Sequence, residues 1–307
     1  MLSPVLLAAA RSRRVRRLLT SVPLTRGVVD RFVAGDDLDA AVDAVRELAG
    51  GGLDVTLDHL GEDTRDREQA RTTRDAYLRL FSVLGEQGLA GGADASVKLS
   101  ALGRAVADDL ALDHAREICA AAERAGMTVT LDMEDHTTVD STLEIFGKLR
   151  ADFPRVGVAI QAMLRRSEGD LRELSGARVR LVKGAYAEPA SVAFQGRREV
   201  DRAYVRGLRT LMRGGGYPMV GSHDPRIIEI ALALAAGRPA GSYEFQMLYG
   251  VRAGEQRRLA GSQRMRVYVP YGADWYGYFM RRLAERPANL VFFLRSLRKE
   301  GSFSWTP

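Results

Sequence analysis

The sequence predicts an α/β protein, namely a (β/α)8 TIM-like barrel with an N-terminal helical arm. Three observations support this: eight short apolar or alternating runs, helix-like segments between them, and a length of 307 residues. Strands that alternate with helices pair in parallel through crossover helices, and eight such units in a chain of this size fit one closed barrel. The predicted domains are a basic helical arm over residues 1–35 and a single barrel domain over residues 36–307.

The net positive charge of the chain is confined to its arm. Six arginines and no acidic residue lie in the first 29 residues, whereas the chain as a whole holds 45 basic and 39 acidic residues. The remainder is therefore electrically balanced, unlike a nucleic-acid-binding body, so no nucleic-acid partner is predicted. The arm is interpreted as a basic amphipathic helix that can contact anionic lipid heads, with a transit peptide as the weaker alternative.

Cysteine content and hydropathy argue against a scaffold held by disulfides or zinc and against a membrane-spanning protein. Cys119 is the single cysteine, so it has no partner for a disulfide within the chain and no spacing typical of zinc ligands. This is compatible with a reducing compartment. The sequence contains no run of 18 apolar residues, so no membrane-spanning helix is predicted.

The predicted elements follow one another in strict alternation. Residues 36–52 are predicted to form an amphipathic helix that ends at glycines, and residues 65–87 form a long helix behind the first strand. The eight predicted strands span residues 53–60, 95–100, 128–134, 156–163, 177–186, 218–223, 242–248 and 264–272. The helix between the fourth and fifth strands is the least marked, because few residues separate those two strands.

Polar side chains gather where these predicted strands end. This set includes Lys98, Asp132, Gln161, Lys183, Ser222, His223, Glu244, Gln246 and Tyr268. Active sites of (β/α)8 barrels lie at the carboxyl ends of the strands, which favours a site there. Burying several cations together is costly, so an anionic ligand is expected among them.

The last strand leads into a helix that carries two adjacent arginines. Tyr278, Arg281 and Glu285 share one face of this helix because of their spacing, and Arg282 follows Arg281 directly. Taken alone, the pattern is typical of a solvated helix with a surface ion pair. Above a barrel mouth, however, the two guanidinium groups fit a single carboxylate, which planar donors match bidentately.

Other kinds of site are less well supported. His59, His136 and His223 follow three different strands and are candidate metal ligands, but the neighbouring lysines and arginines repel a cation, so no metal site is predicted. His114 is interpreted as a surface residue. Residues 222–224 read Ser-His-Asp, yet sequence neighbours need not meet in triad geometry. The sequence contains neither GxGxxG nor GxxxxGK[ST].

Several motifs in strand order carry a resemblance to a known family. They are LDMED at 131–135, Gln161, RLVKGAY at 180–186, GSHD at 221–224, YEFQMLYG at 243–250, VYVPYG at 267–272 and YFMRRLAERPAN at 278–289. From Leu53 to Asn289 the chain resembles proline dehydrogenase, in the short monofunctional bacterial form.

The resemblance implies a flavoprotein. It implies that FAD is held noncovalently at the barrel mouth and that L-proline is oxidised to Δ1-pyrroline-5-carboxylate. It further implies that the electrons pass to membrane ubiquinone or menaquinone. A bacterial cytoplasmic location follows, with reversible peripheral contact at the inner membrane, together with a separate downstream pyrroline-5-carboxylate dehydrogenase.

The resemblance also assigns roles to residues at the matching positions. Asp132 and Arg180 are expected to be catalytic, and Arg180 or Lys183 is expected to stabilise the reduced flavin ring. The expected proline-binding residues are Lys98, Leu248, Tyr268, Tyr278, Arg281, Arg282 and Glu285. The expected FAD-binding residues are Met133, Gln161, Arg180, Val182, Lys183, Gly184, Ala185, Ser222 and His223. Two departures from the family are Ser222 in place of a common threonine and Ala187 where some fused members have tryptophan.

Two alternatives stay open at this point. One is another flavin barrel, such as a methylenetetrahydrofolate reductase-like enzyme, which NADH would reduce. The other is a non-catalytic membrane-binding module that uses the basic arm. The resemblance also places the Tyr268 ring near C4 of proline, which predicts a preference for proline over 4-hydroxyproline.

Overall fold

The computed structural model describes the backbone of residues 29–61 and 64–285, and the side chains of these residues up to 280. Most of the predicted arm lies outside the described residues, and so do the side chains of Arg281, Arg282 and Glu285. Whether residues 1–35 form a separate arm stays a prediction.

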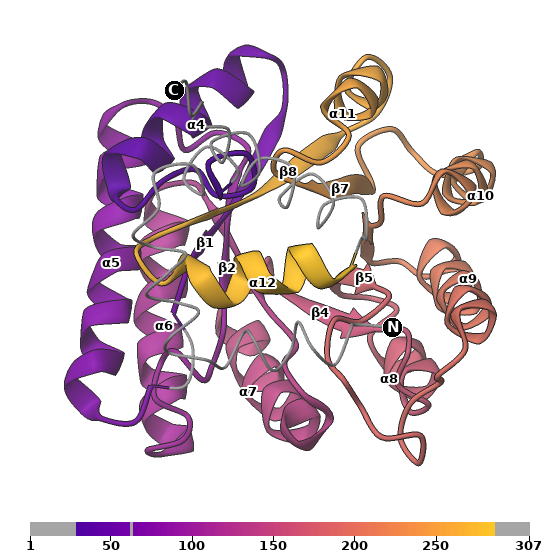
Figure 1. Cartoon of the computed structure of the whole chain (residues 1–307), viewed down its shortest axis with the longest axis horizontal. Coiled ribbons are helices and arrows are strands. Elements are labelled where there is room, and N and C mark those ends of the chain that lie inside the picture. Colours follow the sequence, from indigo (N-terminus) through magenta and orange to yellow (C-terminus); the bar gives the residue numbers. More distant parts are fainter. Residues whose placement is uncertain (1–28, 62–63, 286–307) are drawn as a thin grey trace, which may run out of the picture.

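Eight parallel strands close into a barrel in sequence order, as predicted (Figure 1). They are β1 (Asp54–His59), β2 (Ala93–Val97), β3 (Thr128–Leu131), β4 (Gly157–Gln161), β5 (Arg178–Val182), β6 (Tyr217–Gly221), β7 (Glu244–Leu248) and β8 (Met265–Tyr271). Several strands end earlier than predicted, so polar residues such as Lys98 and Asp132 lie just beyond them. The chain turns after β8 at Gly272, which has a positive φ of 117°, and Pro270 belongs to the strand.

Helices surround the barrel in the described part of the chain; their labels follow Figure 1. They are α4 (Leu38–Gly50), α5 (Arg67–Glu86), α6 (Asp108–Arg124), the 3-10 turn η1 (His136–Thr138), α7 (Val139–Asp152), α8 (Ser167–Glu173), α9 (Arg197–Arg213), α10 (Pro225–Ala235), α11 (Ala253–Ala260) and α12 (Trp275–Glu285). The weakly marked helix between the fourth and fifth strands is the short α8. Within these described ranges, no helix combines the length and apolar character needed to cross a bilayer.

Side-chain alternation along the strands separates a polar barrel interior from an apolar outer face. On β2, Ala95 and Val97 are buried in the apolar core, whereas Asp94 and Ser96 hydrogen-bond to polar residues of other strands. The apolar residues pack against the helices, since successive side chains of a strand point to opposite faces. This arrangement places charged groups inside the barrel and the hydrophobic core between barrel and helices.

The interpretation of His114 as a surface residue was wrong. Its side chain is buried, and Nδ1 lies 3.1 Å from the carbonyl oxygen of Leu102. His114 shares a helical stripe with Ala111, Ala115 and Ile118, which all face the core. Cys119 is also buried, and burial raises the pKa of its thiol to about 12.

The N-terminal end of the described chain packs at the barrel mouth. Ala34 donates a backbone hydrogen bond to Pro270 (2.9 Å), and Gly272 donates one to Gly35 (2.9 Å). Figure 1 shows α12 crossing in front of the strands. An apolar group, here called the mouth cluster, joins the two regions and consists of Val29, Phe32, Val33, Leu60, Trp275, Tyr276, Tyr278, Phe279 and Met280.

Candidate active site

Four of the predicted site residues meet inside the barrel near its mouth and are here called, with their direct partners, the Asp132 group: Lys98 and Asp132 lie just beyond β2 and β3, and Arg180 and Tyr268 lie within β5 and β8. Asp132 is the centre of this group: Oδ1 accepts a hydrogen bond from Arg180 (2.7 Å), and Oδ2 accepts one from the Tyr268 hydroxyl (2.8 Å). The Lys98 ammonium lies 3.5 Å from Oδ2. The guanidinium carbon of Arg180 lies 5.3 Å from the centre of the Tyr268 ring. Sequence reasoning therefore selected residues that are direct neighbours in the fold.

Three further residues of this group were missed from the sequence. Ser96 donates a hydrogen bond to Asp132 (2.7 Å), Asp58 accepts one from Lys98 (2.7 Å), and Asp94 lies 3.5 Å from Arg180. A signal was present, because polar residues at 94, 96 and 98 share one face of an extended strand. The same period-two pattern is what points all three toward the barrel interior.

The electrostatics of the group keep Asp132 ionised. Burial alone raises the pKa of its carboxyl, but Lys98 and Arg180, together with hydrogen bonds from Ser96 and Tyr268, outweigh burial and lower the pKa below its ordinary value. The pKa of the Tyr268 hydroxyl is raised strongly by burial and then by the negative charge of Asp132. Tyr268 therefore remains a proton donor toward Asp132.

The buried Lys98 and the partly buried Lys183 already have protein carboxylates beside them, so burial by itself does not demand an anionic ligand, and the binding of a ligand carboxylate at Lys98 stays a prediction. Lys98 lies between the carboxylates of Asp58 and Asp132, and Lys183 pairs with Asp201 and Asp224. Protein carboxylates thus supply the counter-charge that a buried cation requires.

Glu244 lies at the opposite end of the barrel from the position predicted for it. It begins β7, where its carboxylate accepts hydrogen bonds from Arg266 (2.7 and 3.0 Å) and from Tyr217 (3.0 Å). The strand starts two residues later than predicted, which moves Glu244 to the amino-terminal edge. Gln246, two residues on, reaches from this pair toward Arg180.

Six of the nine residues predicted to bind FAD lie at or just beyond the ends of β3, β4 and β5. Gln161 ends β4; its amide donates to the carbonyl of Glu134 (2.6 Å), and Ala185 N–H approaches its Oε1 (3.4 Å). Met133 is buried next to Asp132. Val182, Lys183 and Gly184 follow in order at the end of β5, but the Lys183 ammonium pairs with carboxylates of α9 and the α10 cap, not with the Asp132 group.

Hydrogen bonds connect the residues that follow β6 with one another and with the end of β7. Nε2 of His223 accepts a hydrogen bond from Leu248 N–H (2.9 Å), and the Ser222 hydroxyl accepts one from Asp224 N–H (3.2 Å). Tyr278 of α12 is buried in the mouth cluster, against which Tyr268 packs. The backbone of α12 carries Arg281, Arg282 and Glu285 within its last two turns.

The three candidate metal-ligand histidines do not come together. His136 pairs with Glu188, His223 bonds to Leu248 N–H, and His59 makes edge contacts with the rings of Tyr77 and Tyr271. Among residues 29–61 and 64–280, no group of three or more His, Cys, Asp or Glu side chains is placed to hold a metal ion.

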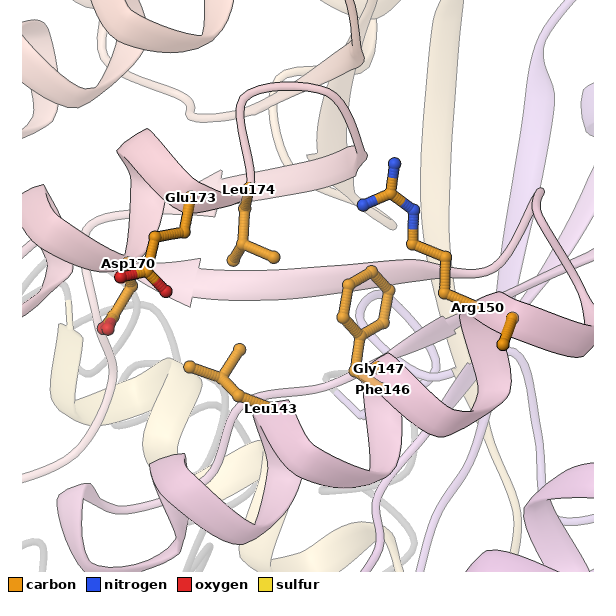
Figure 2. A pocket seen from close by; sticks show the side chains of 8 residues that line it. Leu143, Phe146, Gly147, Arg150, Asp170, Glu173 and Leu174 are labelled. Carbon is orange, nitrogen blue, oxygen red and sulfur yellow. The ribbon is translucent and has the colours of Figure 1, made fainter.

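A separate hollow of about 400 Å3 lies between α7 and α8, outside the barrel (Figure 2). Leu143, Phe146 and Leu174 supply its apolar wall, and the Arg150 side chain donates to the carbonyl of Gly176 (2.8 Å), just before β5. Its lining lacks the residues of the Asp132 group. The candidate active site is therefore the polar group at the mouth, not this hollow.

Gly184→Ala is expected to lower the free energy of unfolding by more than about 1 kcal/mol. Gly184 has a φ of 120°, a left-handed value that disfavours other residues, and a Cβ there would overlap the Met163 side chain. The measurement is urea unfolding. Gly215→Ala is the control, since a Cβ at that position meets nothing within 4 Å. Equal stability of the two variants would contradict the prediction.

Comparison with known proteins identifies the family. The family model described as proline dehydrogenase matches residues 41–295. Proline dehydrogenase 1 of Bacillus subtilis (strain 168) is 40% identical over 281 residues, covering 90% of this chain and 92% of the relative. Proline dehydrogenase of Deinococcus radiodurans is 40% identical over 282 residues, covering 89% and 90%.

The solved structures agree with the sequence relatives. Proline utilization A from Bdellovibrio bacteriovorus, inactivated by N-propargylglycine, superposes with a TM-score of 0.78 at 26% identity. That comparison covers 85% of this chain but only 33% of the larger protein, so the chain matches one part of it. Together with the barrel and its polar mouth, these likenesses show that the chain belongs to the proline dehydrogenase family, whose members are oxidoreductases acting on proline.

Proposed function

We propose that the protein catalyses the FAD-dependent oxidation of L-proline to Δ1-pyrroline-5-carboxylate and passes the electrons to a membrane quinone. The observation that carries this proposal is the Asp132 group, in which a carboxylate, two cations and a tyrosine meet at the barrel mouth. A cation and an aromatic wall side by side suit a small amino acid with a carboxylate and an apolar ring.

The residues beside this group fit FAD. Gly184 lies just beyond β5 with a φ of 120° that suits glycine, and its backbone is among the groups expected to contact the flavin. Beyond β5 and β6, a hollow of about 560 Å3 lies at the N-terminal ends of α9 and α10; it is lined by Arg197, Arg198 and Arg226, and by Asp201 and Asp224, which pair with Arg226. Helix N-termini and the remaining arginines, Arg197 and Arg198, favour phosphate groups, so we infer that the diphosphate of FAD binds at their side of this hollow. Bound FAD would supply the two-electron acceptor for the oxidation.

The remaining steps are the work of the protein's own side chains. Lys98, Arg281 and Arg282 would bind the proline carboxylate and fix the ring in one reactive pose. Nearby cations lower the pKa of the substrate amine, which must be neutral before oxidation. Asp132 keeps Lys98, Arg180 and Tyr268 in place through its hydrogen bonds and charge. The Tyr268 and Tyr278 rings would wall the substrate and exclude water.

The first test is the visible spectrum of the purified protein under anaerobic conditions, recorded before and after L-proline is added. We expect a flavin band that bleaches with proline. A flavin band that ignores proline would move the substrate to another amine or acid, and a protein that takes up no FAD would contradict the cofactor. Addition of NADH is the control for the folate-reductase alternative and is expected to leave the band unchanged.

The value of kcat/KM is expected to be at least about tenfold higher for L-proline than for 4-hydroxyproline, because the Tyr268 ring would press on the carbon that carries the extra hydroxyl. Steady-state assays with both substrates measure this ratio. Tyr268→Ser should narrow it, whereas Tyr268→Phe keeps the ring and should preserve it. Equal values for the wild-type enzyme would contradict the proposed position of Tyr268.

Arg281→Lys is expected to raise KM for proline by more than about tenfold, because lysine cannot pair bidentately with a carboxylate. Arg258→Lys is the matched control: Arg258 lies on α11 and pairs with Glu255 at the surface. KM is measured by steady-state assay with an artificial electron acceptor. An unchanged KM in Arg281→Lys would remove this residue from the proposed clamp.

The electron acceptor and location belong to the same proposal. Quinones reside in the lipid bilayer, so we infer reversible contact with the cytoplasmic face of a bacterial inner membrane and a separate dehydrogenase for the product. Flotation with anionic liposomes tests the contact, with the flavin oxidised and reduced. Absence of binding in both states would contradict it.

A further inference from the structure

We propose that Gln246 is a positioning residue for Arg180, and that the Glu244–Arg266 ion pair holds the Gln246 amide in the orientation this requires. The proposal rests on the proposed function only in that Arg180 is taken to act on the bound cofactor or substrate. The proposal extends the set of residues that act on the active site from the mouth to the amino-terminal end of the barrel.

A continuous series of hydrogen bonds carries the proposal. Arg266 donates to Glu244 Oε1 (2.7 Å), and the Gln246 amide nitrogen donates to the same oxygen (2.5 Å). Gln246 Oε1 then accepts from Arg180 Nε (2.7 Å). Every residue of the series is at most 4% exposed, so water does not offer substitute partners.

The chemistry of the two neighbours allows only one orientation of the amide. Arginine has donors alone, so the oxygen of Gln246 must face Arg180. Glu244 stays ionised: burial alone raises the pKa of its carboxyl, but Arg266 outweighs burial and lowers the pKa to about 2. An ionised carboxylate only accepts, so the nitrogen of Gln246 must face Glu244. A flipped amide would set donor against donor and acceptor against acceptor.

Gln246 fixes an edge of the Arg180 guanidinium that no other close contact fixes. The NH1 edge is held by Asp132 (2.7 Å) and by Ser96 (2.8 Å), and the Nε edge by Gln246. Asp94 approaches NH2 only to 3.5 Å. A planar guanidinium held at two edges cannot pivot, whereas one held at a single edge can turn about that contact. Loss of Gln246 would therefore release Arg180 without removing it.

A direct test follows the Arg180 Nε–H by 1H–15N NMR of the protein as purified, with the signal assigned by its loss in Arg180→Lys. We expect a signal protected from exchange with water in the wild type, and loss of that protection in Gln246→Met, which has similar volume but no acceptor. Tyr217→Phe is the matched control, because Tyr217 donates to the other oxygen of Glu244. The control should destabilise the protein modestly and leave the signal protected.

Kinetics of the FAD-loaded variants provide the second readout. In Gln246→Met, kcat should fall by about tenfold or more, since a hydrogen bond to a charged group is lost beside the reacting site. KM for proline should stay within about threefold, because neither Gln246 nor Arg180 belongs to the proposed carboxylate clamp. Tyr217→Phe should keep both constants. Equal kinetic losses in the two variants would reduce Gln246 to a structural role and overturn the proposal.

Gln246→Glu keeps the proposal testable should Gln246→Met fail to fold. When protonated, the new carboxyl can donate to Glu244 and accept from Arg180, as the amide does; when ionised, it opposes Glu244. The titratable and charged groups connected to this position through Glu244 and Arg180 are Asp54 on β1, Asp94 on β2, Asp132 just after β3, Arg180 on β5, Tyr217 on β6, Glu244 on β7, and Arg266 and Tyr268 on β8.

The ratio of the kcat of Gln246→Glu to that of the wild type should therefore fall as pH rises. A ratio that is flat with pH, together with a protected Arg180 signal, would overturn the proposal. The NMR arm does not use proline or turnover. It consequently separates a failure of this proposal from a failure of the proposed reaction, which the anaerobic spectrum of the wild type tests.

Discussion

Asp132→Asn is expected to lower kcat/KM for L-proline by about two to three orders of magnitude, the range seen when one preorganised polar group is removed from an active site. The carboxylate of Asp132 accepts from Arg180, Ser96 and Tyr268 and lies within 3.5 Å of Lys98. An amide has one acceptor in place of two and no charge. Lys98 and Arg180 would then lose a counter-ion, and the substrate pose would loosen.

Steady-state kinetics at saturating FAD check this result, with flavin content measured so that the rate is expressed per bound cofactor. Asp140→Asn is the matched control: Asp140 pairs with Arg166 on the outer surface and its side chain is 86% exposed. It should leave kcat/KM unchanged. A loss below about tenfold in Asp132→Asn would show that the carboxylate only fills space.

Arg266→Met is expected to lower the free energy of unfolding by about 3–5 kcal/mol, because it leaves Glu244 as an uncompensated buried charge. Arg266 is 2% exposed and Glu244 is fully buried. Arg266 also donates to the carbonyls of Val55 and Gly92 (2.7 Å each). Its loss therefore leaves one carbonyl oxygen on β1 and one just before β2 without this hydrogen-bond donor. Urea unfolding at neutral pH measures the change.

The difference in unfolding free energy between the wild type and Arg266→Met should become smaller at acid pH. The direction of this change follows from the pKa of Glu244. Its folded-state pKa of about 2 lies below the ordinary value of 4.5, so in the wild type its contribution is present above pH 4.5 and lost as pH falls toward 2. Without Arg266 that contribution is absent at every pH. The two proteins should therefore converge in stability as the pH falls through this window, provided both remain folded.

Two further variants test whether the expected loss of stability comes from the uncompensated charge of Glu244. Arg258→Met breaks an exposed pair with Glu255 and should cost no more than about 1 kcal/mol. Adding Glu244→Gln to Arg266→Met removes the orphan charge and should recover part of the stability. A double variant that is less stable than Arg266→Met alone would contradict the uncompensated-charge argument.

The fold was predictable because strand and helix alternate so regularly. Even the least marked helix, α8, lies where the spacing left room for one. Strand ends were less predictable, since an apolar run does not show where backbone pairing stops. This is why Glu244, predicted to lie among mouth residues, belongs to the opposite edge of the barrel.

The candidate site was predictable where a motif or a strand end marked it, as for Asp132 and Lys98. Asp58 and Ser96 were missed because each lies inside a buried strand, where a polar side chain also fits a satisfied core group. The partners of Lys183 come from α9 and the loop before α10, and single-sequence reasoning does not reveal such pairings between distant segments. Whether Arg281, Arg282 and Glu285 act as assigned stays a prediction.

The mouth cluster has a practical consequence for anyone who prepares this protein. Val29 and Phe32 lie before the barrel in the sequence, yet they share one apolar contact region with Trp275 and Phe279 of α12. A chain trimmed to begin at residue 36 would retain every strand and still lack Val29, Phe32 and Val33, three residues of the mouth cluster to which α12 belongs. Trimming at that end therefore removes part of the packing of α12 even where the whole barrel remains.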